Sequence, residues 1–177
     1  MEVSETNEKK WFALYIKPQQ EFKASANLGA KEIEYYMPTI SVVKQWRDRK
    51  KKIIEPIIRG YIFINTDEKG RLIALQSSAV VRTVSFQGKP AVIPAWEIEN
   101  LKRFLSESRD FVVSNKLEIG TKVKITEGPF HDVVGVVTGS QEDKWLAVSI
   151  DLLKRSVMVR LPQESVVKVL ENDAAHQ

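Results

Sequence analysis

Residues 10–105 carry strand-like and helix-like segments in an order that limits the fold more than any other feature of the chain. The stretch WFALYIK (11–17) is rich in aromatic and β-forming residues and ends at a proline, which predicts a buried first strand. A helical pattern follows over residues 19–31. Two strand-like stretches then flank a basic turn, so residues 40–64 are expected to form a long antiparallel hairpin, with Pro38 marking a kink or an edge position.

The rest of this region supplies a helix, a strand and a third helix. DEKGRLIALQSSA (67–79) predicts a short helix, and VVRTVSFQGKPAVIP (80–94) predicts a strand with a turn. In PAWEIENLKRFL, Ile98, Leu101 and Leu105 keep the 3–4 spacing of an amphipathic helix. A strand, a helix, a hairpin, a helix and a strand form the split βαβ arrangement. We therefore expect an α+β protein whose N-terminal domain is a ferredoxin-like antiparallel sheet with helices.

The helical pattern ends at about residue 105. Residues 106–116 are polar and are expected to form a linker, unless the apolar run at 111–113 packs on a domain. Residues 117–171 hold five short strand-like segments separated by turn signals, which predicts a small all-β, SH3-like barrel. The expected domains are therefore residues 10–105 and 117–171, with a disordered lead at 1–9 and a tail at 172–177.

The residues give no support for catalysis or for a cofactor. The chain has no cysteine, and its two histidines, His131 and His176, are far apart in the sequence. No glycine-rich phosphate loop is present. We therefore expect no enzyme activity, no cofactor and no metal. No apolar run approaches the length of a membrane span, and the N-terminus lacks the apolar stretch of a signal peptide, so a cytoplasmic protein is expected. We also expect a monomer.

Two groups of segments resemble known domains. GTKVKITEGPFHDVVGVV (120–137) resembles a KOW motif, with Gly135 seven residues after Gly128. The glycines either only build the barrel or also carry function. Upstream, WFALYIKPQQE, YYMPTISVVKQW, EPIIRGYIFI and VVRTVSFQGKPAVIP resemble the N-terminal domain of the NusG family in order and spacing. Together the two resemblances cover residues 10–171.

The resemblance implies a transcription elongation and antitermination factor that binds bacterial RNA polymerase. In that family an apolar patch of the N-terminal domain docks on the clamp helices of the largest polymerase subunit, which suppresses pausing and termination. Arg59 stands where the family usually has proline, and we expect it to pair with a carboxylate of the partner. Each aromatic side chain of the patch either contacts polymerase or belongs to the core. The implied polymerase-binding residues are Tyr15, Ile58, Arg59, Gly60, Tyr61 and Phe63.

KQWRDRKKK (44–52) has a net charge of +5, which exceeds the +4 of the whole chain. It is either a solvated turn or a contact to DNA or nascent RNA near the transcription bubble. Its tryptophan either stacks on a base or packs against the sheet. The family resemblance also implies that the first helix faces the non-template strand. The candidate nucleic-acid-binding residues are Lys17, Lys23, Lys31, Lys44, Trp46, Arg47, Arg49, Lys50, Lys51 and Lys52.

The predicted barrel differs from the family pattern at SIDLLKRSVMV (149–159). The family has an apolar-Gly-Arg turn there, which binds Rho or a ribosomal protein. Here Leu152 and Leu153 either form a docking knob for such a partner or cap the barrel core. The segments QWRDRKKK and VSFQGKPAVIPAWEIENLKRFL are more similar to specialised paralogs, such as RfaH and the capsule-operon antiterminators of Bacteroides. The alternatives are a housekeeping NusG acting with Rho and the ribosome, and a ribosome-associated RNA-binding protein.

Overall fold

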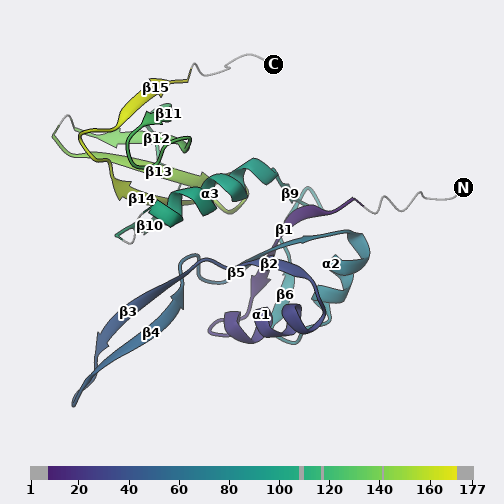
Figure 1. The fold of residues 1–177 in the computed structure, drawn as a ribbon. Coiled ribbons are helices and arrows are strands. Elements are labelled where there is room, and N and C mark those ends of the chain that lie inside the picture. The colour runs from purple at the N-terminus through teal and green to yellow at the C-terminus, as the bar shows by residue number, and fades with distance from the viewer. Residues whose placement is uncertain (1–7, 108–109, 117, 141, 171–177) are drawn as a thin grey trace, which may run out of the picture. The chain divides into compact units, whose positions relative to one another are not determined.

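The computed structural model describes residues 8–107, 110–116, 118–140 and 142–170 (Figure 1). Its internal contacts divide the chain into two units, residues 1–95 and 96–177. Residues 1–7 of the expected lead and the whole expected tail lie outside the described residues. The sequence placed the third helix in the first domain, whereas its contacts place nearly all of it in the second unit.

The first unit is an antiparallel sheet that carries two helices. The sheet order is β2-β5-β1-β6, and a short strand, β9, also pairs with β1. This is the strand order of a ferredoxin-like sandwich, so the predicted fold class is confirmed. Its elements are β1 (Lys10–Ile16), α1 (Glu21–Ala30), β2 (Glu34–Tyr36), β5 (Tyr61–Thr66), α2 (Glu68–Leu75), β6 (Val80–Thr83) and β9 (Val92–Ile93).

The pairing of β1 with β5 decides which side chains enter the core. Leu14 lies opposite Ile62, and both belong to a buried cluster with Leu28 of α1 and Ala74 of α2. Successive side chains of a strand point to opposite faces of its sheet. The tyrosines at 15 and 61, which are the next pair in the register, therefore lie on the face opposite α1 and α2.

The predicted hairpin of residues 40–64 is wrong in one respect, because two separate sheets share this segment. β3 (Thr39–Gln45) and β4 (Lys50–Pro56) form a two-stranded sheet of their own, whereas β2 pairs with β5 in the main sheet. The Ile57 N–H donates a hydrogen bond of 2.8 Å to the Pro38 carbonyl and closes the neck between the two sheets. The β3–β4 hairpin therefore projects from the body of its unit (Figure 1). A second small hairpin joins β7 (Ser85–Phe86) to β8 (Lys89–Pro90).

The second unit contains all five strands predicted for the barrel, plus one more. The sheet order is β10-β14-β13-β12-β11-β15. The additional strand, β10, comes from the stretch expected to be a linker and pairs with β14. A Cβ atom on Gly135 would lie 2.6 Å from the Ala147 carbonyl oxygen, so the close approach of β12 to β13 requires glycine there. The elements are α3 (Ala95–Glu107), β10 (Val112–Ser114), β11 (Thr121–Glu127), β12 (Val134–Gly139), β13 (Lys144–Ile150), η1 (Asp151–Leu153), β14 (Arg155–Arg160) and β15 (Val166–Val169).

Helix α3 belongs to the second unit because its side chains bind the barrel directly. The Asn100 side chain forms a fork on Val134: its Nδ2 donates to the carbonyl at 2.6 Å, and its Oδ1 accepts from the N–H at 2.8 Å. One turn further on, the rings of Phe104 and Phe130 lie 5.4 Å apart between centroids, and both are buried. Polar and apolar contacts together therefore hold α3 on β12 and on the loop before it.

Replacing Asn100 by alanine should lower the free energy of unfolding of the second unit by about 1–3 kcal/mol, because two backbone groups of Val134 lose their partner. Hydrogen exchange of the β12 amides in the full chain measures this loss. The control is Glu99→Ala on the exposed side of the same helix, which should change stability by no more than about 0.5 kcal/mol. Equal effects of the two substitutions would contradict the role of the fork.

Candidate functional site

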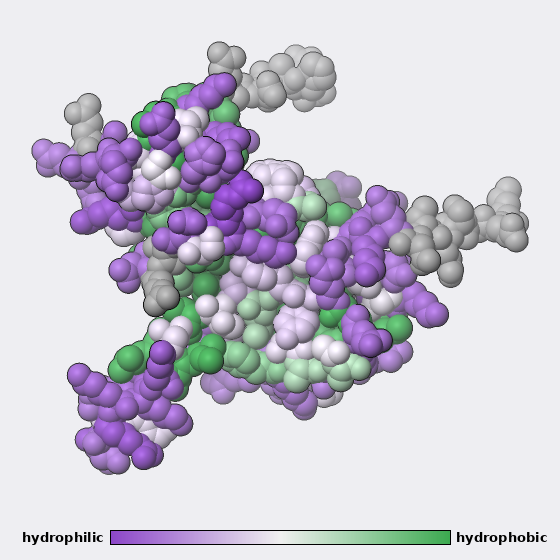
Figure 2. All heavy atoms as spheres, viewed as in Figure 1, coloured by the Kyte–Doolittle hydropathy of each residue, from purple (hydrophilic) through white to green (hydrophobic). Residues whose placement is uncertain are grey.

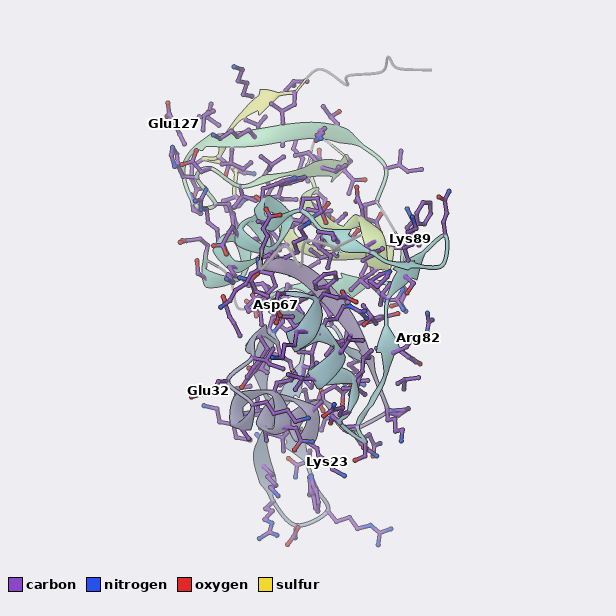
Figure 3. All side chains as sticks on the ribbon, turned by 90° about the vertical axis from the view of Figure 1, so that its right-hand side faces the viewer. Lys23, Glu32, Asp67, Arg82, Lys89 and Glu127 are labelled. Atoms are coloured by element: carbon purple, nitrogen blue, oxygen red, sulfur yellow. The ribbon has the colours of Figure 1, made fainter. Side chains whose placement is uncertain are left out.

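Two tyrosines and an arginine form a continuous surface across three strands of the first unit. Tyr15 on β1 lies opposite Tyr61 on β5, and their ring centroids are 5.6 Å apart. On the other side of β1, Arg82 of β6 is the register partner of Tyr15 and places its guanidinium 5.8 Å from that ring. Both tyrosines are half-buried, so their rings are supported while part of each stays accessible. We call Tyr15, Gly60, Tyr61 and Arg82 the tyrosine patch; Figure 3 labels Arg82 on β6.

Gly60 fixes the point at which the chain enters β5. Its φ of +81° lies in the left-handed region, which glycine adopts without strain. Its carbonyl accepts a 2.9 Å hydrogen bond from the Ile16 N–H, and its own N–H donates to Glu21 Oε1 at 3.0 Å. The buried Glu21 carboxylate at the start of α1 therefore anchors the residue that precedes Tyr61.

Arg59 pairs within its own chain. Its Nη2 lies 2.8 Å from Glu55 Oε2, and the other oxygen of Glu55 accepts from Lys44 Nζ. The hydrogen bond from Lys44, together with the charge and hydrogen bond of Arg59, holds the pKa of Glu55 below its ordinary value. Glu55 pairs with Arg59 within the chain, and this ion pair links the base of the β3–β4 hairpin to the edge of the tyrosine patch.

Two residues expected in the docking set are core residues in the structure. Ile58 and Phe63 are both buried, and the Phe63 ring stacks on Tyr36 with centroids 6.2 Å apart. A side chain with almost no accessible surface has no area to offer a partner. Of the six residues expected to contact polymerase, Tyr15, Arg59, Gly60 and Tyr61 are the ones that reach the surface.

The cationic residues predicted in the hairpin are all exposed, and they lie around its tip. Lys51 Nζ lies 5.4 Å from the centre of the Trp46 ring, whose exposure of 52% shows that it does not pack against the main sheet. Figure 2 shows hydrophilic residues gathered at the far end of this hairpin and apolar ones near its base. The exposed predicted residues of the hairpin are Lys44, Trp46, Arg47, Arg49, Lys50, Lys51 and Lys52.

The three lysines predicted near the first helix are exposed, but they differ in location and in contacts. Lys17 lies between β1 and α1, and Lys23 lies on the outer side of α1 (Figure 3). Lys31 Nζ donates to the Ile73 carbonyl at 3.1 Å and so ties the end of α1 to α2.

The predicted leucine knob of the barrel is half present. Leu153 is buried in the 3₁₀ turn η1, and Leu152 is half-buried beside it. The turn closes on Lys154, whose φ of +52° lets the chain reverse into β14 without a glycine. Leu153 therefore caps the barrel core, and Leu152 alone presents partial surface.

Sequence reasoning missed Glu21 and Arg82. Glu21 resembles any solvated acidic residue in the first turn of a helix, and no feature of its neighbours indicates that it accepts from Gly60. Arg82 reaches Tyr15 only through the pairing of β6 with β1, which includes a register shift between Tyr15 and Ile16. Within the described residues, no group of three or more His, Cys, Asp or Glu side chains could hold a metal ion, and no helix is long and apolar enough to cross a membrane.

The sequence matches a family model and curated relatives of one kind. Residues 9–102 match a family model described as transcription termination factor NusG. The transcription termination/antitermination protein NusG of Pasteurella multocida is 30% identical over 144 residues, which cover 76% of each chain. Its counterpart in Chlamydia trachomatis is 26% identical over 164 residues, covering 85% of this chain and 89% of the relative. A solved structure of Thermotoga maritima NusG covers 87% of this chain and 93% of its own, at 20% identity and a TM-score of 0.47.

Glu21→Ala should lower the free energy of unfolding of the first unit by about 1–3 kcal/mol, because the Gly60 N–H loses its acceptor. Amide exchange at Gly60 and Tyr61 should become faster in the same variant. Glu21→Gln is the matched control, since it removes the charge but keeps an acceptor oxygen, and it should retain most of the protection. If glutamine failed as completely as alanine, the charge of Glu21 and not its hydrogen bond would be what holds the turn.

Proposed function

The chain belongs to the NusG family of transcription termination/antitermination factors, and we propose that it acts by docking the tyrosine patch on the clamp helices of RNA polymerase. NusG-family proteins act with RNA polymerase. The observation that carries the proposal is the contact of Tyr15 with Tyr61 across neighbouring strands, at 5.6 Å between ring centroids, with both rings half-buried. Aromatic rings that already pack against each other offer contact area and lose little conformational freedom on binding. Such rings are typical anchors of protein interfaces.

The mechanism is differential binding. A ligand that binds the closed clamp more tightly than the open clamp shifts polymerase toward the closed, processive state by the difference in affinity. The turn at Gly60, held by Glu21, presents Tyr61 in one conformation before polymerase arrives. This preorganisation reduces the ordering cost of binding.

The basic hairpin supplies the second contact in this proposal. Its exposed lysines and arginines fit the phosphate backbone of nucleic acid near the transcription bubble, a contact independent of sequence and sensitive to salt. Because Glu55 binds both Lys44 and Arg59, the base of the hairpin is tied to the edge of the tyrosine patch. Docking of the patch would therefore fix where the hairpin reaches.

We also propose that the chain is a specialised, operon-directed paralog within this family. The barrel turn that in the family pattern carries an apolar-Gly-Arg sequence here contains a buried Leu153 and ends at Lys154. This turn lacks the family's features for binding Rho or a ribosomal protein. A housekeeping NusG that acts with both is the alternative.

Tyr15→Ala and Tyr61→Ala should each weaken binding to core RNA polymerase about 30-fold or more, the effect of losing an interface anchor worth about 2 kcal/mol. Tyr35→Ala is the matched control, because Tyr35 is exposed and pairs with Ile64, whose side chain enters the helix-covered core. A binding titration with purified polymerase, without nucleic acid, measures all three. Retained binding by Tyr61→Ala would reject this docking site, whereas failure of the wild-type chain to bind polymerase would favour a ribosome-associated RNA-binding protein.

Transcription through a terminator-containing template separates the two branches of the family. A specialised antiterminator should increase read-through and should not increase release by Rho, because its barrel turn lacks the Rho-binding pattern. The measurement compares full-length and terminated transcripts with and without Rho, at saturating amounts of this protein. Enhanced Rho-dependent release would instead identify a housekeeping factor.

A further inference from the structure

The β3–β4 hairpin has two chemically different faces. Its register places β3 residues directly opposite β4 residues, and directly opposed residues share a face of the ribbon. One face, which we call the open face, consists of the pairs Ser41–Ile54, Val43–Lys52 and Gln45–Lys50. The other, which we call the closed face, consists of the pairs Ile40–Glu55, Val42–Ile53 and Lys44–Lys51.

The side chains of the closed face are engaged within the chain. Lys44 binds Glu55, and the Lys51 ammonium lies over the Trp46 ring. The three apolar residues of this face, Ile40, Val42 and Ile53, are all partly covered. The closed face therefore supports the hairpin and leaves the open face to meet a ligand.

The open face combines exposed apolar side chains with cations and has no carboxylate. Val43 is 64% exposed and Ile54 is 60% exposed, and they are diagonal neighbours on the ribbon. Lys50 and Lys52 continue the face toward the tip, and neither has an ion-pair partner in the described part of the chain. The Gln45 amide nitrogen donates to the Trp46 carbonyl. An isolated two-stranded ribbon is only marginally stable in water, so a partner that covers this face would also stabilise the hairpin.

We propose that the open face enters the major groove of B-form duplex DNA and that Val43 and Ile54 contact thymine methyl groups. The major groove is about 12 Å wide and admits a two-stranded ribbon, and the thymine methyl is its one apolar feature. Lys50 and Lys52 would reach the phosphates at the groove edge and fix the register of the ribbon. The deep, narrow major groove of A-form RNA excludes such a ribbon.

This inference rests on the proposed function only where that function brings the hairpin to nucleic acid. It adds a sequence preference for thymine to a contact that would otherwise involve phosphates alone. The tyrosine patch takes no part in it, so a failure of polymerase docking and a failure of groove reading appear in different variants.

The test compares binding of the full chain to two 20-base-pair duplexes, alternating d(AT) and alternating d(AU), at one salt concentration. The duplexes differ only in the thymine methyl groups. The wild-type chain should bind d(AU) more weakly, by about fourfold for each methyl contacted, the effect of about 0.8 kcal/mol per buried carbon. Val43→Ala combined with Ile54→Ala should bring the two affinities together.

Two further variants keep the test sound. Val43→Thr combined with Ile54→Thr retains the branching that favours strands, so its hairpin should form even if the alanine variant loses its own. This threonine variant should also reduce the preference for d(AT). Val92→Ala alters an exposed valine on β9 and should leave the preference unchanged.

Three results would overturn the proposal: equal wild-type affinity for the two duplexes, binding of duplex r(AU) as tight as that of d(AT), or loss of polymerase affinity by the double variant without DNA. The last would show that the open face binds protein. Tyr61→Ala should keep the wild-type preference for d(AT), and its loss of polymerase binding tests the proposed function alone.

Discussion

The antiparallel register between β1 and β5 is the constraint on which the first unit depends. It runs from Lys10 opposite Thr66 to Tyr15 opposite Tyr61. Because side chains alternate along a strand, this register sends Leu14 and Ile62 to the core beneath the helices and both tyrosines to the other face. A shift by one residue would exchange the two sets, so the pairing that builds the core also assembles the tyrosine patch. The proposed docking surface therefore forms as the sheet folds.

The end of β4 and the turn before β5 connect the basic hairpin to the tyrosine patch. Glu55 near the end of β4 binds Lys44 of β3 and Arg59 in the turn before β5. Gly60 then leads the chain into β5 with a positive φ, and its N–H donates a hydrogen bond to Glu21. A short exposed ion-pair network contributes little stability. It joins the base of the basic ribbon to the turn that precedes Tyr61.

Sequence reasoning predicted the elements well where a pattern is local. Alternating apolar residues, helical spacing and turn signals predict the ferredoxin-like order and the five barrel strands. The assignments that failed depend on contacts between distant segments. Phe63 and Tyr61 share a face by alternation, yet the alternation does not tell how deeply each is covered, and Phe63 proved to be core. Likewise, the local periodicity of α3 shows an apolar face but not which unit that face binds. The hydrogen bond from Asn100 to the Val134 carbonyl attaches the helix to the second unit.

Photo-crosslinking from position 61 on elongating polymerase tests most directly whether the tyrosine patch docks on the clamp helices. A photoreactive phenylalanine analogue in place of Tyr61 samples the surroundings of this one side chain, and the same analogue at Tyr35 is the control on the other face of the sheet. Docking of the tyrosine patch predicts that position 61 gives a crosslink to the clamp helices of the largest polymerase subunit and that position 35 gives none. A crosslink from position 61 to ribosomal protein or RNA alone, or equal crosslinks from both positions, would contradict it.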